Sequence, residues 1–138
     1  MKKVIIYTDG GARCNPGPAG IGVHIEDEAR NTIGDYQKYI GETTNNQAEY
    51  QAVYLAMEKI KEIHVQEVEF YLDSLLVVQQ LNGVYKIKDK NLGVWFVKIW
   101  NEKMKYKKIT FTHIPREQNK IADKLVNIAI DQELALKA

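Results

Sequence analysis

The sequence lacks most of the features that mark secreted, membrane-bound or zinc-stabilised proteins. Its single cysteine, Cys14, excludes an internal disulfide and agrees with a reducing compartment. No apolar run approaches the roughly 20 residues of a membrane helix, and the apolar stretch after the basic N-terminus is too short for a signal peptide. Cysteine and histidine nowhere have the spacing of zinc ligands. We therefore expect a cytoplasmic protein with no membrane partner.

Repeats, low-complexity tracts and linkers are also absent from the 138 residues, of which 45% are hydrophobic and 27% charged. This composition is ordinary for a globular protein, and the length is sufficient to bury a core without disulfides or metals. We expect a single domain that spans residues 1–138 and is monomeric.

The net charge of +1 conceals an uneven distribution. Between Lys86 and Lys108, eight lysines stand against Asp89 and Glu102, so this segment carries +6 and the rest of the chain −5. A basic segment beside an acidic body is typical of proteins that meet a polyanion over one face. A lysine-rich solvated helix is the alternative, and charge alone favours it.

Two periodicities divide the chain into strands and helices. β-Branched and aromatic residues bounded by turn signals predict strands at residues 3–8, 20–25, 32–40, 68–74 and 108–115. Apolar residues at helical spacing predict helices that begin near residue 45, at 75–81, at 91–105 and at 119–136. Thr44 and Gln47 fit a capping box for the first helix. The order predicts a mixed α/β domain with a helix-covered sheet, in which short turns make the first three strands antiparallel.

Four acids occupy comparable places in these elements. Asp9 and Asp73 each end a predicted strand, Glu49 lies in the first turns of a helix, and Asp123 lies near the start of another. Functional groups of open α/β sheets gather at strand ends and at the neighbouring helix N-termini, so the four acids could converge. Each acid also has an ordinary explanation, as a turn residue, a helix cap or a surface charge.

Crowded carboxylates raise one another's pKa unless cations neutralise them. Oxygen ligands without cysteine or histidine favour Mg²⁺ or Mn²⁺. Two such ions, about 4 Å apart, support in-line displacement at a phosphodiester. His113, near Pro115, is a candidate for proton handling, although a strand-end histidine without a role fits the spacing equally.

Four segments, in this order and spacing, resemble type 1 ribonuclease H, in a compact form without the long basic protrusion. They are YTDGGARCNPGPAGIGV, ETTNNQAEYQAV, LDSLLVVQQLNG and HIPREQNKIADKL. The resemblance implies the ribonuclease H-like fold, with a mixed five-stranded sheet of three antiparallel and then two parallel strands, flanked by helices. It also implies an endonuclease that hydrolyses the RNA strand of RNA–DNA hybrids, independently of sequence, with two Mg²⁺ ions that Mn²⁺ can replace. The products would carry 5′-phosphate and 3′-hydroxyl ends.

Carried over residue by residue, the resemblance assigns two sets of site residues. The metal-binding and catalytic acids would be Asp9, Glu49, Asp73 and Asp123, with His113 assisting water attack or product departure. Nine residues would bind the hybrid: Gly10, Gly11, Asn15, Thr44, Asn45, Asn46, Ser74, Trp95 and Asn119. For Thr44 and Asn119 the resemblance implies either a contact with phosphate or the positioning of the histidine loop. Amides and asparagine side chains can test for the 2′-hydroxyls that distinguish RNA from DNA. For Trp100 we expect packing in the core instead.

Two residues depart from the family pattern, Leu75 at a substrate contact and Cys14 in the glycine-rich loop. Leu75 follows Asp73-Ser74 where many relatives carry a polar residue, and Cys14 replaces a commonly small residue. Two alternative functions remain open: a nuclease of the same fold that also acts on double-stranded RNA, and a non-catalytic hybrid-binding module. The second alternative predicts the loss of a metal ligand, whereas all four acids are present.

Overall fold

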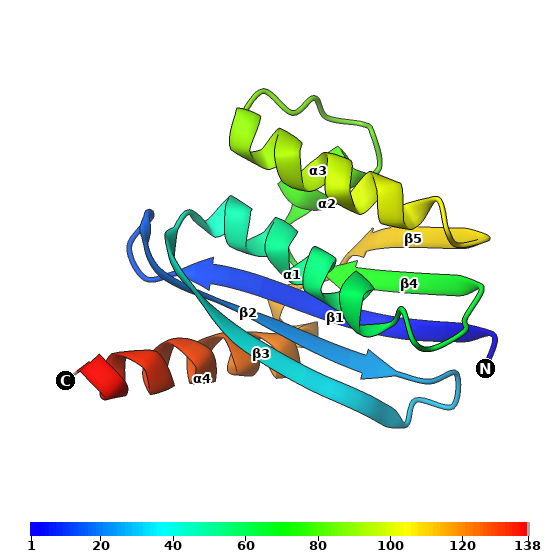
Figure 1. Cartoon of the computed structure of the whole chain (residues 1–138), viewed down its shortest axis with the longest axis horizontal. Coiled ribbons are helices and arrows are strands. Elements are labelled where there is room, and N and C mark those ends of the chain that lie inside the picture. Colours follow the sequence, from blue (N-terminus) through cyan, green and yellow to red (C-terminus); the bar gives the residue numbers. More distant parts are fainter. Residues whose placement is uncertain (138) are drawn as a thin grey trace.

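The structure, a computed structural model, describes residues 1–137. Its strands are β1 (Lys3–Ala12), β2 (Gly17–Glu26), β3 (Thr32–Thr43), β4 (Glu67–Leu72) and β5 (Lys108–His113). Its helices are α1 (Asn45–Lys59), α2 (Leu75–Leu81), α3 (Lys90–Lys103) and α4 (Lys120–Lys137), with a short 3-10 turn, η1 (Arg116–Gln118), before α4 (Figure 1). None of the helices described within residues 1–137 is long and apolar enough to cross a membrane.

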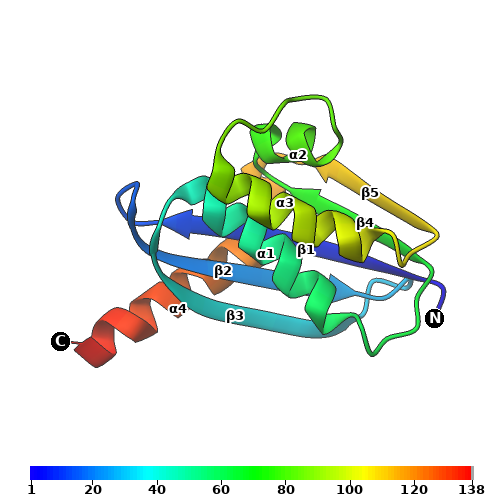
Figure 2. The ribbon, with the colours of Figure 1, turned by 45° about the horizontal axis from the view of Figure 1, so that its top comes forward.

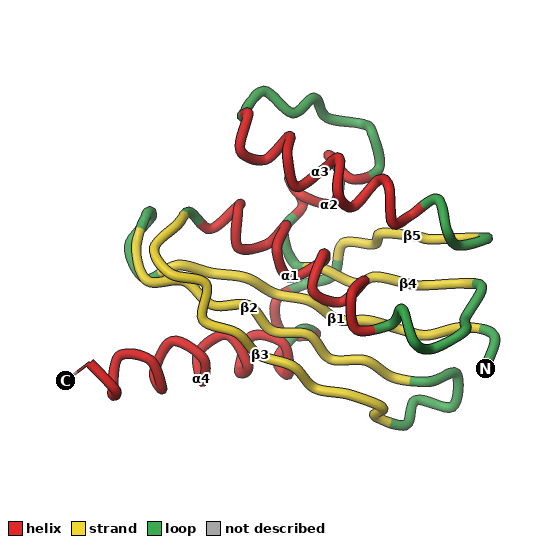
Figure 3. The backbone as a smooth tube through the Cα atoms, in the orientation of Figure 1, coloured by secondary structure: helices red, strands yellow, loops and turns green. Residues whose placement is uncertain are grey.

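The five strands form one mixed sheet in the order β3-β2-β1-β4-β5 (Figure 3). β1 pairs with β2 and β2 with β3 in antiparallel orientation, whereas β4 is parallel to both β1 and β5. The predicted order of elements and the predicted fold class are therefore confirmed.

Helices cover both faces of this sheet (Figures 1 and 2). Successive residues of a strand point to opposite faces, and β1 shows where the helices lie. A Cβ atom on Gly10 would meet Ala48 of α1, whereas one on Gly11 would face Val126 of α4. α1 and α4 thus pack on opposite faces, and α3 lies against the outer side of α1 (Figure 2).

The main core lies between the sheet and the layer of α1, α2 and α3. Phe70 of β4 stacks on Phe111 of β5, with ring centroids 5.2 Å apart. The buried Tyr50 hydroxyl donates a hydrogen bond of 2.6 Å to Gln80 of α2, which satisfies both polar groups inside the core. This core fixes the beginning of α1 and the end of β4 next to each other.

All five predicted strand ends differ from the structure by one to four residues, and two of these differences concern the acids. β1 continues through Gly10 and Gly11 to Ala12 because the antiparallel pairing with β2 continues there, although the parallel pairing with β4 stops at Tyr7. Asp9 therefore does not end β1 but lies just beyond the point where its parallel neighbour stops pairing. β4 ends one residue before Asp73, so this acid begins the turn into α2.

Candidate active site

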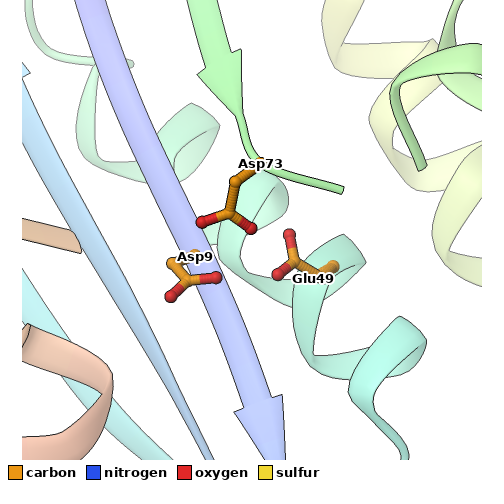
Figure 4. Close-up of side chains that lie close together, drawn as sticks. All are labelled: Asp9, Glu49 and Asp73. Carbon is orange, nitrogen blue, oxygen red and sulfur yellow. The ribbon is translucent and has the colours of Figure 1, made fainter. Parts of the chain in front are cut away.

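Three acids meet where β4 ends beside β1. Asp9 of β1, Glu49 of α1 and Asp73 after β4 each place a carboxylate oxygen within 4.8 Å of the other two (Figure 4). They line a cavity of about 510 Å³ that is open to solvent. The sequence places these acids on three separate elements, and the sheet order brings them together.

A glycine permits the close approach of α1 to β1. A Cβ atom on Gly10 would lie only 2.3 Å from the carbonyl carbon of Ala48, so no other residue fits without moving the helix. The Gly10 amide also donates a hydrogen bond of 3.2 Å to Oε1 of Glu49. This amide therefore holds a carboxylate, where the sequence suggested a contact with the nucleic acid.

Burial changes the protonation of two of the acids. Asp9 and Glu49 are only 7% and 5% exposed. Burial raises the pKa of Asp9 to about 7; a hydrogen bond with Glu49 opposes the rise, and the charges of Asp73 and Asp123 add to it. Burial also raises the pKa of Glu49 well above its ordinary value, and the charge of Asp9 is the second-largest cause of this rise. The cluster therefore resists carrying its full negative charge without a cation.

The donor set fits a hard divalent cation. Oε2 of Glu49 is buried and has no hydrogen-bond partner among the described residues, an expensive arrangement for a carboxylate oxygen. A cation bound by the three carboxylates would supply that partner. Carboxylate oxygens are the ligands that Mg²⁺ and Mn²⁺ prefer, so Asp9, Glu49 and Asp73 could hold either ion.

Asp123 lies on the wall of the same cavity but outside the group of three. Its helix α4 reaches the sheet over Gly22 of β2, where a Cβ atom would lie 2.3 Å from the carbonyl oxygen of Ala122. Oδ1 of Asp123 is 3.6 Å from Nη2 of Arg116, so this carboxylate already forms an ion pair with the arginine. Of the four acids expected to converge, the structure thus brings three into one cluster and leaves the fourth beside it.

The expected hybrid-contacting asparagines tie the glycine-rich loop to α1. Asn15 Oδ1 accepts a hydrogen bond of 2.9 Å from the Asn45 amide, and Asn45 Oδ1 accepts one of 2.8 Å from the Ala12 amide. Asn45 and Asn46 line the cavity. These side chains are therefore ordered next to the acids, with Asn15 exposed to solvent.

Two other expected contact residues cap helices. Thr44 caps α1 by accepting a hydrogen bond from the Gln47 amide, as the capping box predicts. Ser74 caps α2 through the Val77 amide and also lines the cavity beside Asp73. Both residues fix the beginning of a helix that borders the site.

The remaining expected residues lie further from the acids or are inaccessible. His113 is exposed at the end of β5, opposite Leu72 in register, and is not one of the described residues that line the cavity. Asn119 is only 1% exposed, which excludes it as a surface for the hybrid.

Trp95 was expected to contact the hybrid and Trp100 to pack in the core, but Trp95 is the more buried of the two. Trp95 is half-buried and packs edge-on against Tyr54 of α1 at 5.7 Å. Trp100 was expected in the core, but it is 46% exposed and stacks on Phe96. The helix phase explains the error, because Trp95 lies on the buried stripe of Leu92 and Ile99 and Trp100 does not.

Two arginines at the cavity were missed by the sequence reasoning. Arg13 pairs with Asp131 of α4 at 2.6 Å and donates a hydrogen bond of 3.2 Å to Asn127. Arg116 pairs with Asp123, as described above. Both arginines lie inside the quoted segments, next to the glycine-rich loop and after His113. The sequence did contain a signal for these arginines, because each lies within a few residues of a predicted site residue.

Comparison with known proteins adds independent information. A family model described as reverse transcriptase-like matches residues 7–129. The structure of LC11 ribonuclease H1, isolated from compost by a metagenomic approach, shares 53% identity and a TM-score of 0.91, covering 97% of this chain and 99% of that one. The same protein in complex with an RNA/DNA hybrid shares 52% identity and a TM-score of 0.91, covering 95% of this chain and 99% of that one.

Curated relatives agree with the structural match. Ribonuclease H of Ruthia magnifica is 32% identical over 96% of this chain and 98% of its own length. A bifunctional protein of Mycobacterium tuberculosis is 35% identical over 94% of this chain. The chain spans only 36% of that mycobacterial protein's length.

Proposed function

The chain belongs to the type 1 ribonuclease H family, and from this membership we propose that it hydrolyses the RNA strand of RNA–DNA hybrids as a sequence-independent endonuclease. Two divalent ions, Mg²⁺ or Mn²⁺, would take part, and the products would carry 5′-phosphate and 3′-hydroxyl ends. The LC11 relative has been crystallised with an RNA/DNA hybrid, which supports this substrate.

The carboxylate cluster carries this proposal. Asp9, Glu49 and Asp73 place oxygens within 4.8 Å of one another in an open cavity, and one buried Glu49 oxygen has no partner among residues 1–137. These acids, with Asp123 beside them, would hold the ions. When bound, such ions supply an activated water and stabilise the charge on the leaving oxygen.

The protein's own groups would orient this chemistry. The Gly10 amide donates a hydrogen bond to one oxygen of Glu49 and so would help to orient the carboxylate in the cavity. Arg13 and Arg116 place positive charge on the cavity wall, where phosphates of the RNA strand would pass.

Proton transfer is assigned to His113. The exposed end of β5 lets its imidazole exchange protons with water, so it would accept a proton from the attacking water or deliver one to the departing hydroxyl. The structure leaves it outside the cavity wall, so this role requires that it approach the bound hybrid.

Recognition of RNA is assigned to the loop that Asn15 and Asn45 organise. The hydrogen bonds from the Asn45 amide to Asn15 Oδ1 and from the Ala12 amide to Asn45 Oδ1 hold side-chain amides and backbone groups at the cavity entrance, next to Asn46. Amide groups can donate to and accept from 2′-hydroxyls, and the shallow minor groove of a hybrid offers few base-specific contacts. Cleavage is therefore expected to depend on sugar identity rather than on sequence.

A panel of labelled duplexes tests the proposal. RNA–DNA, RNA–RNA and DNA–DNA duplexes of one sequence would each be incubated with Mg²⁺, Mn²⁺ or EDTA. We expect cutting of RNA only when it is paired with DNA, and only with metal. Cutting of RNA–RNA duplexes at a similar rate would favour the broader nuclease, and hybrid binding without cutting would favour a non-catalytic module.

A further inference from the structure

Asn119 occupies a buried position between η1 and α4, at the back of the carboxylate cluster. It is only 1% exposed, so it cannot be a surface that the hybrid touches. The nitrogen of its side-chain amide nevertheless reaches the site: Nδ2 donates one hydrogen bond of 2.8 Å to the Thr8 carbonyl and one of 3.2 Å to Oδ2 of Asp73. Of the two roles that the resemblance gives Asn119, contact with phosphate or positioning of the histidine loop, this burial argues against the first.

These bonds connect three elements that carry acids. Thr8 immediately precedes Asp9 in β1, and Asp73 follows β4. The backbone carbonyl of Asn119 accepts a hydrogen bond of 3.1 Å from the Asp123 amide, which begins the hydrogen-bonded part of α4. One residue thus links the local backbone or side chain of three of the four acids.

We propose that Asn119 is a positioning residue, which orients the Asp73 carboxylate for divalent-ion binding and fixes it relative to β1. This inference rests on the proposed function, because it assigns Asn119 a task within the same site. It differs from a substrate contact, because Asn119 acts only through Asp73 and the β1 backbone.

The chemistry of an amide suits this task. A carboxylate has about four acceptor sites on two oxygens, so one N–H donor fixes its orientation and leaves the other sites for a cation. The amide is neutral, so it orients Asp73 without neutralising it. By contrast, Arg116 places a positive charge against Asp123, which competes with a bound cation. Outer partners that orient metal-binding carboxylates usually contribute 10- to 100-fold, a rough range, to metal affinity or activity.

Stability alone does not explain an asparagine at this place. Oδ1 of the same amide is buried and has no hydrogen-bond partner among the described residues. A buried acceptor without a partner costs about 1–3 kcal/mol. The donating half of the amide is used twice and the accepting half not at all, which is the pattern expected of a donor that serves Asp73.

The test compares Asn119→Ser with a matched control, Asn82→Ser. Serine is a favoured residue at the beginning of a helix, so Asn119→Ser keeps the start of α4 while its short hydroxyl cannot reach both acceptors. Asn82 also donates from its amide to a strand carbonyl, that of Phe111 at 3.1 Å, but it lies outside the cavity. Both variants lose an amide-to-carbonyl bond, and only one of them loses a bond to an acid.

Three measurements decide the role: Mn²⁺ binding by calorimetry without hybrid, steady-state hybrid cleavage, and thermal unfolding. For Asn119→Ser we expect Mn²⁺ affinity and kcat to fall about tenfold while KM stays within about twofold. For Asn82→Ser we expect a comparable loss of Tm with Mn²⁺ affinity and kcat unchanged. If Asn119→Ser does not fold, Asn119→Asp keeps the shape without the donor, and it should lose kcat at unchanged KM.

Other results would overturn the inference. A raised KM with unchanged kcat and Mn²⁺ affinity would make Asn119 a substrate contact. Equal effects of both serine variants on Mn²⁺ binding would make its role purely structural. If the wild-type protein did not cleave hybrids, the proposed function would fail, and the Mn²⁺ titration would still decide whether Asn119 orients Asp73.

Discussion

Replacing Asp9 by asparagine should stabilise the metal-free protein, although it removes a proposed metal ligand. Asp9 is 7% exposed, and the pKa of its carboxyl group is raised to about 7 by burial and by neighbouring acids. Above that pH the folded protein must carry a charge that its interior disfavours. Asparagine has nearly the same shape and no charge, so the substitution removes this penalty.

The size of the effect follows from the pKa. An unperturbed aspartate has a pKa of 3.8, and one pKa unit corresponds to about 1.4 kcal/mol, so the rise to about 7 limits the penalty to about 4 kcal/mol. Water in the open cavity reduces this value. We expect a gain of about 2 kcal/mol in the free energy of unfolding, or about 6 °C in Tm for a chain of this length.

The pH dependence gives the sign of the effect. Between the unfolded and folded pKa values, the unfolded chain releases a proton that the folded chain keeps, so the free energy of unfolding falls as pH rises from about 4 to about 7. Asp9→Asn should therefore be more stable than the wild type at pH 8 and equal to it near pH 4.

Thermal unfolding by circular dichroism in EDTA, at both pH values, measures this difference. Glu62→Gln, which removes an exposed charge in the turn after α1, is the control for net charge. Adding Mn²⁺ should raise the Tm of the wild type and leave that of Asp9→Asn nearly unchanged. A variant that is less stable than the wild type at pH 8, or equally stabilised at both pH values, would refute the electrostatic reasoning.

Three further predictions concern other parts of the molecule. Gly10→Ala should lose about 2–3 kcal/mol of unfolding free energy in urea, because its Cβ would lie 2.3 Å from the Ala48 carbonyl carbon. Gly11→Ala, whose nearest contact would be at 3.8 Å, should lose less than about 1 kcal/mol. Equal losses would contradict the close-packing argument. Glu102→Gln should lose about 1 kcal/mol of unfolding free energy at pH 7 and less at pH 3. Hydrogen bonds from two lysines lower the pKa of Glu102, and the stability that its charge provides is lost as pH falls through that pKa. A loss that does not depend on pH in thermal unfolding would exclude the ion pairs as its cause. His113→Ala should lower kcat more than it changes hybrid affinity in a binding titration, and an unchanged kcat would exclude His113 from proton transfer.

The sequence predicted the order and type of the elements because each has its own apolar periodicity and turn signals. The end of β1 was not predictable in this way, because Gly10 and Gly11 disfavour strands locally and are held in β1 by pairing with β2. The helical pattern of α3 did contain the distinction between Trp95 and Trp100, since only Trp95 continues the stripe of Leu92.

The acids of the candidate site were predictable because their positions depend on strand ends and helix starts. The separation of Asp123 from the other three acids was not predictable, because the place of Asp123 depends on how closely α4 packs on Gly22 and on the ion pair with Arg116. The hydrogen bonds of Asn119 also lie beyond sequence reasoning, since they join residues 46 and 111 positions away. Side-chain direction, rather than element order, is what the structure adds.

The most direct test of the central claim compares hybrid cleavage by the wild-type protein and by Asp73→Asn. Asp27→Asn is the matched control, because Asp27 lies in the turn between β2 and β3 and accepts backbone hydrogen bonds that asparagine can also accept. With Mg²⁺ and an RNA–DNA hybrid, we expect cutting by the wild type and by Asp27→Asn, and none by Asp73→Asn at an unchanged circular dichroism spectrum. Retained cutting by Asp73→Asn would contradict the assignment of the carboxylate cluster as the catalytic metal site.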